Sequence, residues 1–201
     1  MKPDPISGTQ GTVAYADLYA KSHTVVDINY VLGYADLPII DQIPGYSMLD
    51  VGCGTGGYYQ LLKNHARIIG LDFSEPMIQR AEILTKALGI ERVEFVHTLF
   101  ENFTTTDKFD VIRIPGVYGF YLPWTFPVML KVKSLLNDNG LAVLGAITPK
   151  TLPQRFKKAI VGSRSRLIFE RNFHRLLDQA RLRSIYRLGL PQTDLFFVTH
   201  K

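Results

Sequence analysis

The sequence predicts an α/β protein with one seven-stranded, mostly parallel sheet, helices on both faces in three layers, and an antiparallel last strand. Three observations favour this class. Short apolar runs alternate with segments of helical periodicity. A glycine-rich turn follows the first apolar run, and two closely spaced apolar runs close the chain. Because parallel neighbours need a long crossover between them, this alternation indicates strands joined through helices.

The elements follow in order along the chain. After a loose polar start, apolar and aromatic residues at three-to-four spacing predict helices, whereas short apolar runs bounded by turn residues predict buried strands. Ser74 offers an N-cap to the helix that begins at residue 75. We expect helices at 13–22, 25–42, 54–66, 75–88, 126–136 and across 152–180, strands at 47–52, 67–73, 93–99, 109–114, 141–147, 183–190 and 194–201, and a turn at 137–140.

Length and composition indicate one globular domain over residues 1–201, with an N-terminal helical lid at 1–44, a ligand-binding core at 45–146, and substrate-side helices and closing strands at 147–201. A single cysteine excludes an internal disulfide, and the five histidines are scattered, so no metal site is expected. No apolar run is long enough for a membrane span, and the start lacks the pattern of a signal peptide. We therefore expect a cytoplasmic protein that does not act at a membrane.

The positive charge is concentrated in one segment. The net charge is +5, but residues 151–187 hold ten Lys or Arg against Glu170 and Asp178, a balance of +8, which leaves −3 elsewhere. Such a segment can attract phosphate, a carboxylate, an acidic protein or nucleic acid. It can equally be the solvated face of an amphipathic helix, because apolar residues lie between the basic ones.

The stretch from residue 48 to 57 is the most informative. Its glycines allow a sharp turn and a close approach of the backbone to a ligand, beside the free N–H groups of the segment that follows. The spacing of Gly52, Gly54 and Gly57 also satisfies the dinucleotide fingerprint. However, Asp50 lies two residues before the first glycine, and its carboxylate would be an unfavourable neighbour for the diphosphate of a dinucleotide. Asp72 ends the second strand, where the ribose diol of a ligand would lie.

Taken together, MLDVGCGTGGYYQLL and RIIGLDFSEPMIQRAE resemble the class I S-adenosylmethionine-dependent methyltransferases. The segments KFDVIRI and LKVKSLLNDNGLAVLGA match that family more loosely, so the resemblance spans residues 46–146. It implies a Rossmann-like fold, S-adenosylmethionine as cofactor and S-adenosylhomocysteine as product.

The resemblance also implies roles for single residues. The glycine loop would form the floor under the methionine part of the cofactor, Asp50 would face its amino group, and Asp72 would accept hydrogen bonds from both ribose hydroxyls. This chain departs from the family at Leu99, where an acid often takes the adenine amino group. The cofactor-binding residues expected on this basis are Asp50, Gly52, Cys53, Gly54, Gly56, Asp72, Phe73, Met77, Leu99 and Phe100, with Tyr15 or Tyr19 from the lid.

The acceptor side is less defined. The aromatic loop after the fourth strand contributes Tyr118 and Tyr121 as substrate contacts, unless its aromatic residues serve packing alone. Arg164 is a third substrate candidate, suited to an acidic or carrier-tethered molecule. His97, His174 and Tyr118 are the candidate catalytic residues, because a histidine with a pKa near neutrality suits a general base.

The leading hypothesis is methyl transfer to an oxygen or nitrogen of a small molecule by a monomer or homodimer. A second hypothesis is transfer or cyclisation of the aminobutyrate arm of the same cofactor, which yields methylthioadenosine. A third is methylation of RNA or a carrier protein through the basic segment, although nucleic acid is the less expected partner. A binding module without catalysis is disfavoured by the intact set of Asp50, Gly52, Gly54 and Asp72.

Overall fold

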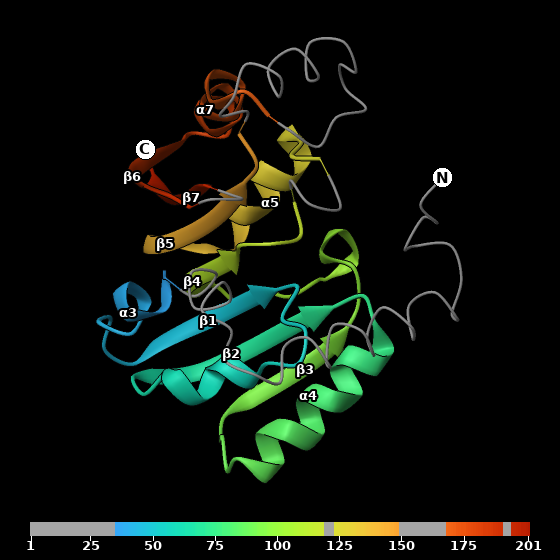
Figure 1. The fold of residues 1–201 in the computed structure, drawn as a ribbon. Helices are drawn as coiled ribbons and strands as arrows, with labels where there is room; N and C mark the ends of the chain where they lie inside the picture. The colour runs from blue at the N-terminus through green and yellow to red at the C-terminus, as the bar shows by residue number, and fades with distance from the viewer. Residues whose placement is uncertain (1–34, 119–122, 149–167, 191–193) are drawn as a thin grey trace. The chain divides into compact units, whose positions relative to one another are not determined.

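The computed structural model describes residues 35–118, 123–148, 168–190 and 194–201. Seven strands form one sheet, as the sequence predicted, and the structure gives their order as β3-β2-β1-β4-β5-β7-β6. The chain divides into two compact units, one of Met1–Gly45 with Gly52–Phe103 and the other of Tyr46–Val51 with Thr104–Lys201. Figure 1 labels their elements.

The first unit is built around two parallel strands and one long helix. Strand β2 pairs with β3, and Asp72 at the end of β2 lies opposite His97 at the end of β3. Pro76 fits the first turn of α4, whose apolar side packs toward the two strands. The elements are α3 (Leu37–Ile40), η2 (Gly57–Leu61), β2 (His65–Asp72), α4 (Glu75–Ala87), β3 (Val93–His97) and η3 (Phe100–Asn102).

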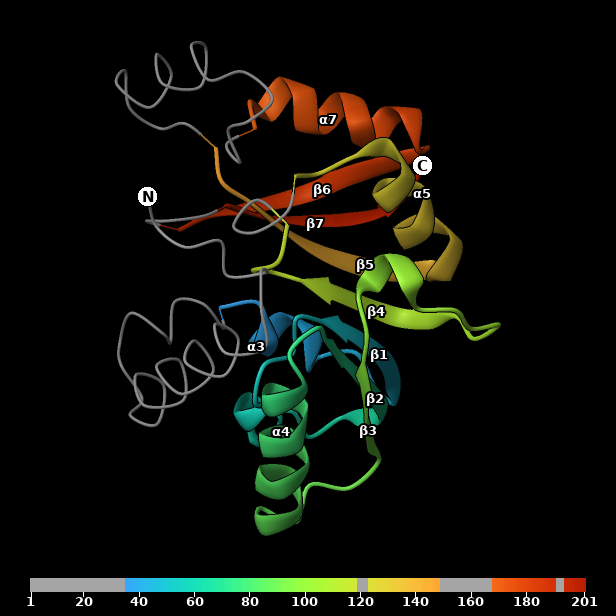
Figure 2. The same cartoon turned by 90° about the vertical axis from the view of Figure 1, so that its right-hand side faces the viewer.

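The second unit holds the remaining strands. Strands β1, β4 and β5 are parallel neighbours, and β7 runs antiparallel to both β5 and β6, which confirms the expected antiparallel last strand. Helix α7 lies along β6 and beside α5 (Figure 2). The elements are β1 (Tyr46–Val51), β4 (Phe109–Ile114), α5 (Phe126–Leu135), β5 (Leu136–Ala146), α7 (Glu170–Gln179), β6 (Leu182–Gly189) and β7 (Asp194–His200).

The predicted helix at 54–66 is wrong. The chain forms only the short 3-10 helix η2 and then enters β2 at His65. Gly56 has a positive φ of 61°, which α-helical residues do not adopt, and the glycines before η2 weaken any helix there. Further on, Asp41 Oδ1 accepts the N–H groups of Lys63 and Asn64, which ends the turn and directs the chain into the strand.

Three other boundaries differ from the prediction. Residues 137–140 are part of β5 rather than a turn, because Asn137 donates to the Asp110 carboxylate and the pairing shifts between Phe109 and Val111. Of the helix expected at 25–42, the described residues contain only α3. It ends before Pro44 and before Gly45, which has a positive φ. Of the helices expected across 152–180, the described residues contain α7. Residues 1–34 and 149–167, which include the helix expected at 13–22, lie outside the described residues.

A carboxylate joins the beginnings of three strands. Asp110 accepts hydrogen bonds from Ser47 N at 2.9 Å, Ser47 Oγ at 2.8 Å and Asn137 Nδ2 at 2.6 Å. Burial raises the pKa of Asp110, but these hydrogen bonds outweigh it and hold the pKa below its usual value. The ionised carboxylate therefore stabilises the folded state above the usual aspartate pKa, and this contribution is lost as the pH falls through the lowered pKa.

We expect Asp110→Asn to lower the free energy of unfolding by about 1–2 kcal/mol at neutral pH, because hydrogen bonds to a charged group are weakened. The deficit should shrink on acidification. Urea unfolding at neutral and acidic pH measures it. The exposed Asp138 provides the control Asp138→Asn, which should match the wild type at both pH values. An Asp110→Asn deficit that does not change with pH would contradict the assignment.

Candidate functional site

The loop that follows β1 has an unusual backbone. Gly52, Gly54 and Gly56 have φ values of 77°, 57° and 61°, in the left-handed region that favours glycine. The N–H groups of Gly52 and Cys53 both donate to the carbonyl of Leu71, at 2.7 and 3.0 Å, so the loop is bound to the end of β2. A side chain at Gly56 would also meet the ring of Tyr59 at 3.0 Å. The predicted glycine loop is therefore a tight turn of fixed shape.

Asp72 anchors this turn. Its Oδ2 accepts the Gly54 N–H at 3.0 Å and its Oδ1 accepts the Ser74 N–H at 2.9 Å. The carboxylate thus joins the glycine loop to the N-terminus of α4. Burial raises the pKa of Asp72, although the N–H groups of Ser74, Gly54 and Phe73 and the nearby His97 act in the opposite direction. A carboxylate in this position gains from any further hydrogen-bond donor.

Two polar side chains accompany Asp72. Ser74 occupies the N-cap position of α4, but its hydroxyl makes no capping hydrogen bond, so the predicted cap is wrong in its chemistry. The Ser74 Oγ is buried and has no hydrogen-bond partner among the described residues. His97 is exposed, and its Nε2 lies 2.9 Å from the carbonyl oxygen of Phe73. A ligand with polar groups can supply the hydrogen-bond partner that this buried hydroxyl lacks, next to the buried carboxylate.

These groups fit the nucleoside part of S-adenosylmethionine. A carboxylate has about four acceptor positions, so Asp72 can hold the loop and still accept from ribose hydroxyls. Half-buried Phe73 follows directly in the chain, and Met77 is buried one helical turn further on. Leu99, at the position where the family often has an acid, is apolar and 43% exposed, whereas Phe100 is buried.

The second unit contains an ion pair that the sequence reasoning missed. Asp50 and Arg113 are register partners on β1 and β4, and Arg113 Nη1 lies 3.4 Å from Asp50 Oδ1. Both side chains are buried. The available signal was a lone arginine in the otherwise apolar end of the strand at 109–114. Asp50 is thus present at the end of β1 as expected, with a positive charge beside it.

The described residues on both sides of the gap at 119–122, after β4, are closely packed. The Trp124 Nε1 donates to the carbonyl of Gly145 at 2.9 Å, and the ring of Trp124 lies 4.7 Å from that of Tyr118. Phe173 of α7 continues this aromatic cluster. Tyr118 is buried in it, which matches the packing alternative for the aromatic loop. Tyr15, Tyr19, Tyr121 and Arg164 lie outside the described residues.

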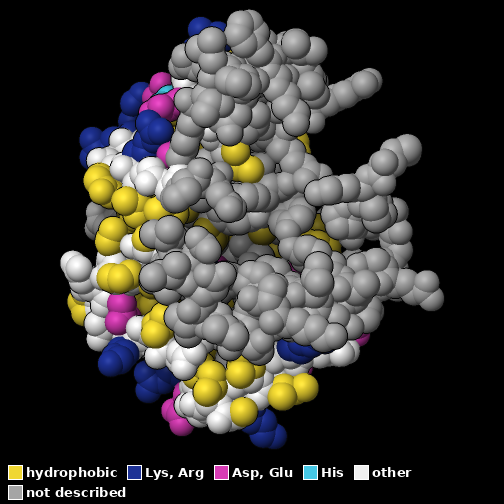
Figure 3. Space-filling model, viewed as in Figure 1, with side chains coloured by type: hydrophobic (Ala, Val, Ile, Leu, Met, Phe, Trp, Pro, Cys, Tyr) yellow, Lys and Arg dark blue, Asp and Glu magenta, His cyan; other side chains and the backbone are white. Residues whose placement is uncertain are grey.

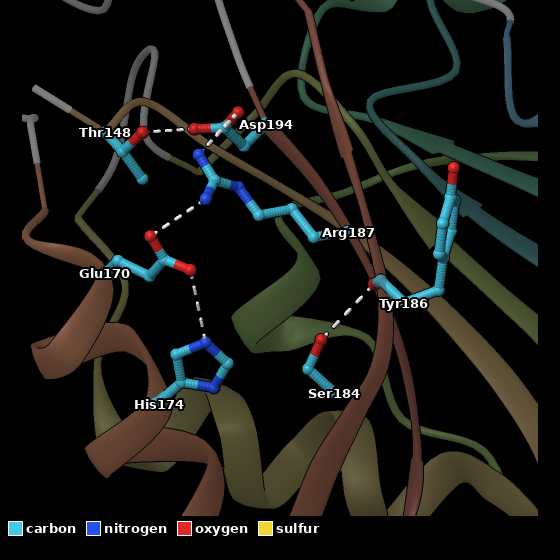
Figure 4. Close-up of polar contacts among 7 residues, drawn as sticks. All are labelled: Thr148, Glu170, His174, Ser184, Tyr186, Arg187 and Asp194. Atoms are coloured by element: carbon cyan, nitrogen blue, oxygen red, sulfur yellow. Dashed lines mark hydrogen bonds and ion pairs between the residues drawn. The ribbon is translucent and has the colours of Figure 1, made fainter. Parts of the chain in front are cut away.

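His174 belongs to a chain of polar contacts near the ends of β5, β6 and β7 (Figure 4). Its Nε2 lies 3.7 Å from Glu170 Oε1, and Glu170 Oε2 accepts from Arg187 at 2.9 Å. Arg187 also lies 3.3 Å from the buried Asp194, which accepts the hydroxyl proton of Thr148. His174 is therefore a half-buried histidine near a carboxylate, and it lies in a different compact unit from His97.

In the described part of the basic segment, Arg187 is neutralised, because it faces two carboxylates. Asp178 of the same segment pairs with Lys201, which lies outside the segment, at 3.0 Å. Where Figure 3 colours the side chains of described residues, acidic and basic side chains occur next to one another. The described residues contain no cluster of His, Cys, Asp or Glu able to hold a metal ion, and none of their helices has the length and apolarity of a membrane span.

Comparisons with known proteins identify relatives of this chain. Residues 43–181 match the model of a family described as a methyltransferase domain. A demethylmenaquinone methyltransferase from Bacillus cytotoxicus is 43% identical over 63 residues, which are 29% of this chain and 27% of that protein. The chain spans less than half the length of the curated relatives it matches first.

Two solved structures show the likeness of the fold. A TehB-like SAM-dependent methyltransferase from Corynebacterium glutamicum has a TM-score of 0.67 at 19% identity, with 96% of this chain and all of that chain (100%) covered. An N-methyltransferase from Bradyrhizobium japonicum, solved with S-adenosylhomocysteine, has a TM-score of 0.64 at 18% identity and covers 86% of this chain and 85% of that one.

Proposed function

The chain belongs to the methyltransferase-domain family, and from that premise we propose that it transfers a methyl group from S-adenosylmethionine to an oxygen or nitrogen of a small molecule. The observation that carries the proposal is the Asp72 carboxylate, held by the N–H groups of Gly54 and Ser74 beside a turn of left-handed glycines. A ribose diol donates to a carboxylate, and the Ser74 hydroxyl is a further polar contact for the nucleoside.

The sulfonium of S-adenosylmethionine supplies an already activated methyl group. The chain's task is then to hold the acceptor atom about 3–3.5 Å from the methyl carbon, in line with the bond that breaks, and to exclude water. A base is needed only where the acceptor arrives protonated. His97 and His174 are the candidates: His97 lies beside Asp72, and His174 Nε2 lies 3.7 Å from Glu170 Oε1. Tyr118, buried against Trp124, is the third candidate.

The basic segment bears on the kind of acceptor. Arg187 is already paired with two carboxylates, which leaves it less able to neutralise phosphates of RNA. Arg164 and the other basic residues of 151–167 remain candidates for an acidic or carrier-tethered substrate. We further propose that the protein is cytoplasmic and works as a monomer or homodimer.

Mass spectrometry of the purified protein, incubated with S-adenosylmethionine and a cell metabolite extract, tests the proposal. We expect S-adenosylhomocysteine above a heat-denatured control, together with a metabolite heavier by one methylene unit. Methylthioadenosine in place of S-adenosylhomocysteine would indicate aminobutyrate chemistry instead. Methylation found only in added RNA or carrier protein would overturn the small-molecule part of the proposal and leave methyl transfer standing.

The raised pKa of Asp72 predicts the pH dependence of cofactor binding. Hydroxyl donors favour the ionised carboxylate, so the affinity for S-adenosylhomocysteine should fall as the pH falls through the raised pKa, and binding near that pH should release a proton. The ligand-free protein should behave oppositely and lose stability as the pH rises through the same pKa, because burial penalises the charged form. Calorimetry in buffers of different ionisation heat measures the proton release, and a constant affinity over this range would contradict the assignment.

A further inference from the structure

The start of β5 contains a wide bulge. Across it, the register of β5 with β4 jumps from Leu136 to Leu141, whereas β4 advances past Asp110 alone. Residues 137–140 therefore have no register partners among the described strands. Because a bulge leaves its extra residues outside the hydrogen-bonded ladder, these residues are held less tightly than the strand from Leu141 onward.

The bulge contains the only asparagine–glycine pair in the chain, Asn139 with Gly140. Asn139 is exposed, and its side-chain amide makes no hydrogen bond to the residues that the structure describes. The nearby Asn137 differs, because its amide donates to Asp110 at 2.6 Å. The side chain of Asn139 is therefore free to turn toward the backbone that follows it, whereas that of Asn137 is held in place.

Packing requires glycine at position 140. A Cβ at Gly140 would lie 2.8 Å from the side chain of Leu136 and 2.9 Å from the carbonyl oxygen of Asn137. The second of these atoms belongs to the backbone and cannot turn away, so a larger residue would strain the bulge. Glycine has no Cβ to shield its own backbone nitrogen. The same residue that fits the bulge therefore leaves this nitrogen open to the side chain of Asn139.

From these observations we propose that Asn139 is a site of spontaneous deamidation. The backbone nitrogen of Gly140 attacks the side-chain carbonyl carbon of Asn139, its proton passes through water to the amide nitrogen, and ammonia leaves a cyclic succinimide. Water then opens the ring. Opening at the side-chain carbonyl gives aspartate, and opening at the backbone carbonyl gives isoaspartate, in which the main chain runs through the side-chain methylene. The net change takes in one water and releases one ammonia, with no oxidation or reduction.

The modification weakens the junction of strands at Asp110. Either product adds a negative charge to the bulge that lies opposite Asp110 and already carries the exposed Asp138. A like charge disfavours the ionised form of the Asp110 carboxylate, which accepts the hydrogen bonds of Ser47 and Asn137. Isoaspartate also lengthens the main chain inside the bulge. We therefore expect the deamidated protein to unfold at a lower urea concentration than the fresh protein.

Peptide mapping by mass spectrometry tests the proposal on the folded wild-type protein, incubated at mildly alkaline pH and physiological temperature. The product peptides are heavier by the difference between a hydroxyl and an amino group, and chromatography separates aspartate from isoaspartate. Asn102 is the internal control, because it is also exposed and its side chain makes no hydrogen bond to the described residues, but the bulky Phe103 follows it. We expect deamidation at Asn139 to be at least about tenfold faster than at Asn102, because glycine does not hinder ring closure.

Two variants connect the chemistry to stability. Asn139→Ser removes the reacting amide, so its urea midpoint should stay constant during the incubation, while that of the wild type falls. Asn102→Ser is the matched control and should lose stability as the wild type does. Equal rates at Asn139 and Asn102 would overturn the proposed site, and deamidation at Asn139 with an unchanged urea midpoint would overturn its effect on the Asp110 junction. Neither measurement involves the cofactor, so both results are independent of the proposed function.

Discussion

Asp72→Ala is expected to abolish methyl transfer and to weaken the binding of S-adenosylhomocysteine by at least about 100-fold. The ionised Asp72 would accept two ribose hydroxyls, and each hydrogen bond to a charged group contributes about 1.5–3 kcal/mol. The same substitution leaves the N–H groups of Gly54 and Ser74 without their acceptor, so the loop loses its shape as well. Calorimetry and the product assay measure the two losses.

Asp72→Asn separates these two effects. The amide keeps one acceptor oxygen for the loop but turns an NH₂ group toward the other backbone donor, so we expect binding between that of Asp72→Ala and the wild type. Asp41 is the matched control, because its Oδ1 also accepts two backbone N–H groups, those of Lys63 and Asn64, before β2 begins. Asp41→Ala should reduce stability without changing affinity. Equal affinity losses in the Asp41 and Asp72 variants would refute a direct role of Asp72.

Gly145→Ala is expected to lower the free energy of unfolding by about 3 kcal/mol, at the upper end of overpacking effects. A Cβ at Gly145 would lie 1.9 Å from the carbonyl oxygen of Pro115, which is backbone and cannot rotate away. Relief requires the chain after β4 to shift, together with the Trp124 side chain that donates to the Gly145 carbonyl. For a chain of this size, the melting temperature should fall by roughly 6–12 °C.

Gly116 in the same loop supplies the control. A Cβ at Gly116 would meet no atom within 4 Å, so Gly116→Ala should change stability by less than about 1 kcal/mol. If the loop after β4 positions the acceptor, Gly145→Ala should also raise the Michaelis constant for the acceptor, with cofactor affinity unchanged. A Gly145→Ala protein as stable as Gly116→Ala would show that the approach of Pro115 to β5 is not tight.

Much of the fold was predictable because each buried strand is a short apolar run with turn residues at its ends. Strand β4 begins and ends where the pattern of 109–114 predicts, and α4 begins at Glu75 after the serine that marks its start. The failures have local causes. At 54–66, where a helix was expected, Gly56 adopts a left-handed backbone conformation, and only the short 3-10 helix η2 forms. In β5, a hydrogen bond between Asn137 and Asp110 extended the strand through an apparent turn.

The candidate site divides in the same way. The positions of Asp72 and the glycines were predictable, because the glycine loop and the end of the next strand are short local patterns only 18 residues apart, from Gly54 to Asp72. The partner of Asp50 was not, since Arg113 is 63 residues away and becomes a neighbour only through the register of β1 against β4. His174 was named as a candidate base, and the structure adds that its Nε2 lies 3.7 Å from Glu170 Oε1.

The sequence by itself determined the order of strands and helices, the place of the glycine turn and the acid at the end of β2, because periodicity and backbone freedom are properties of neighbouring residues. Only the tertiary structure decided which charges meet and which glycine has no space for a side chain. Asp50 of β1 meets Arg113 of β4, and Gly145 of β5 lies against Pro115, the residue that follows β4. Such contacts depend on strand register and on the close packing of the interior, which no local pattern encodes.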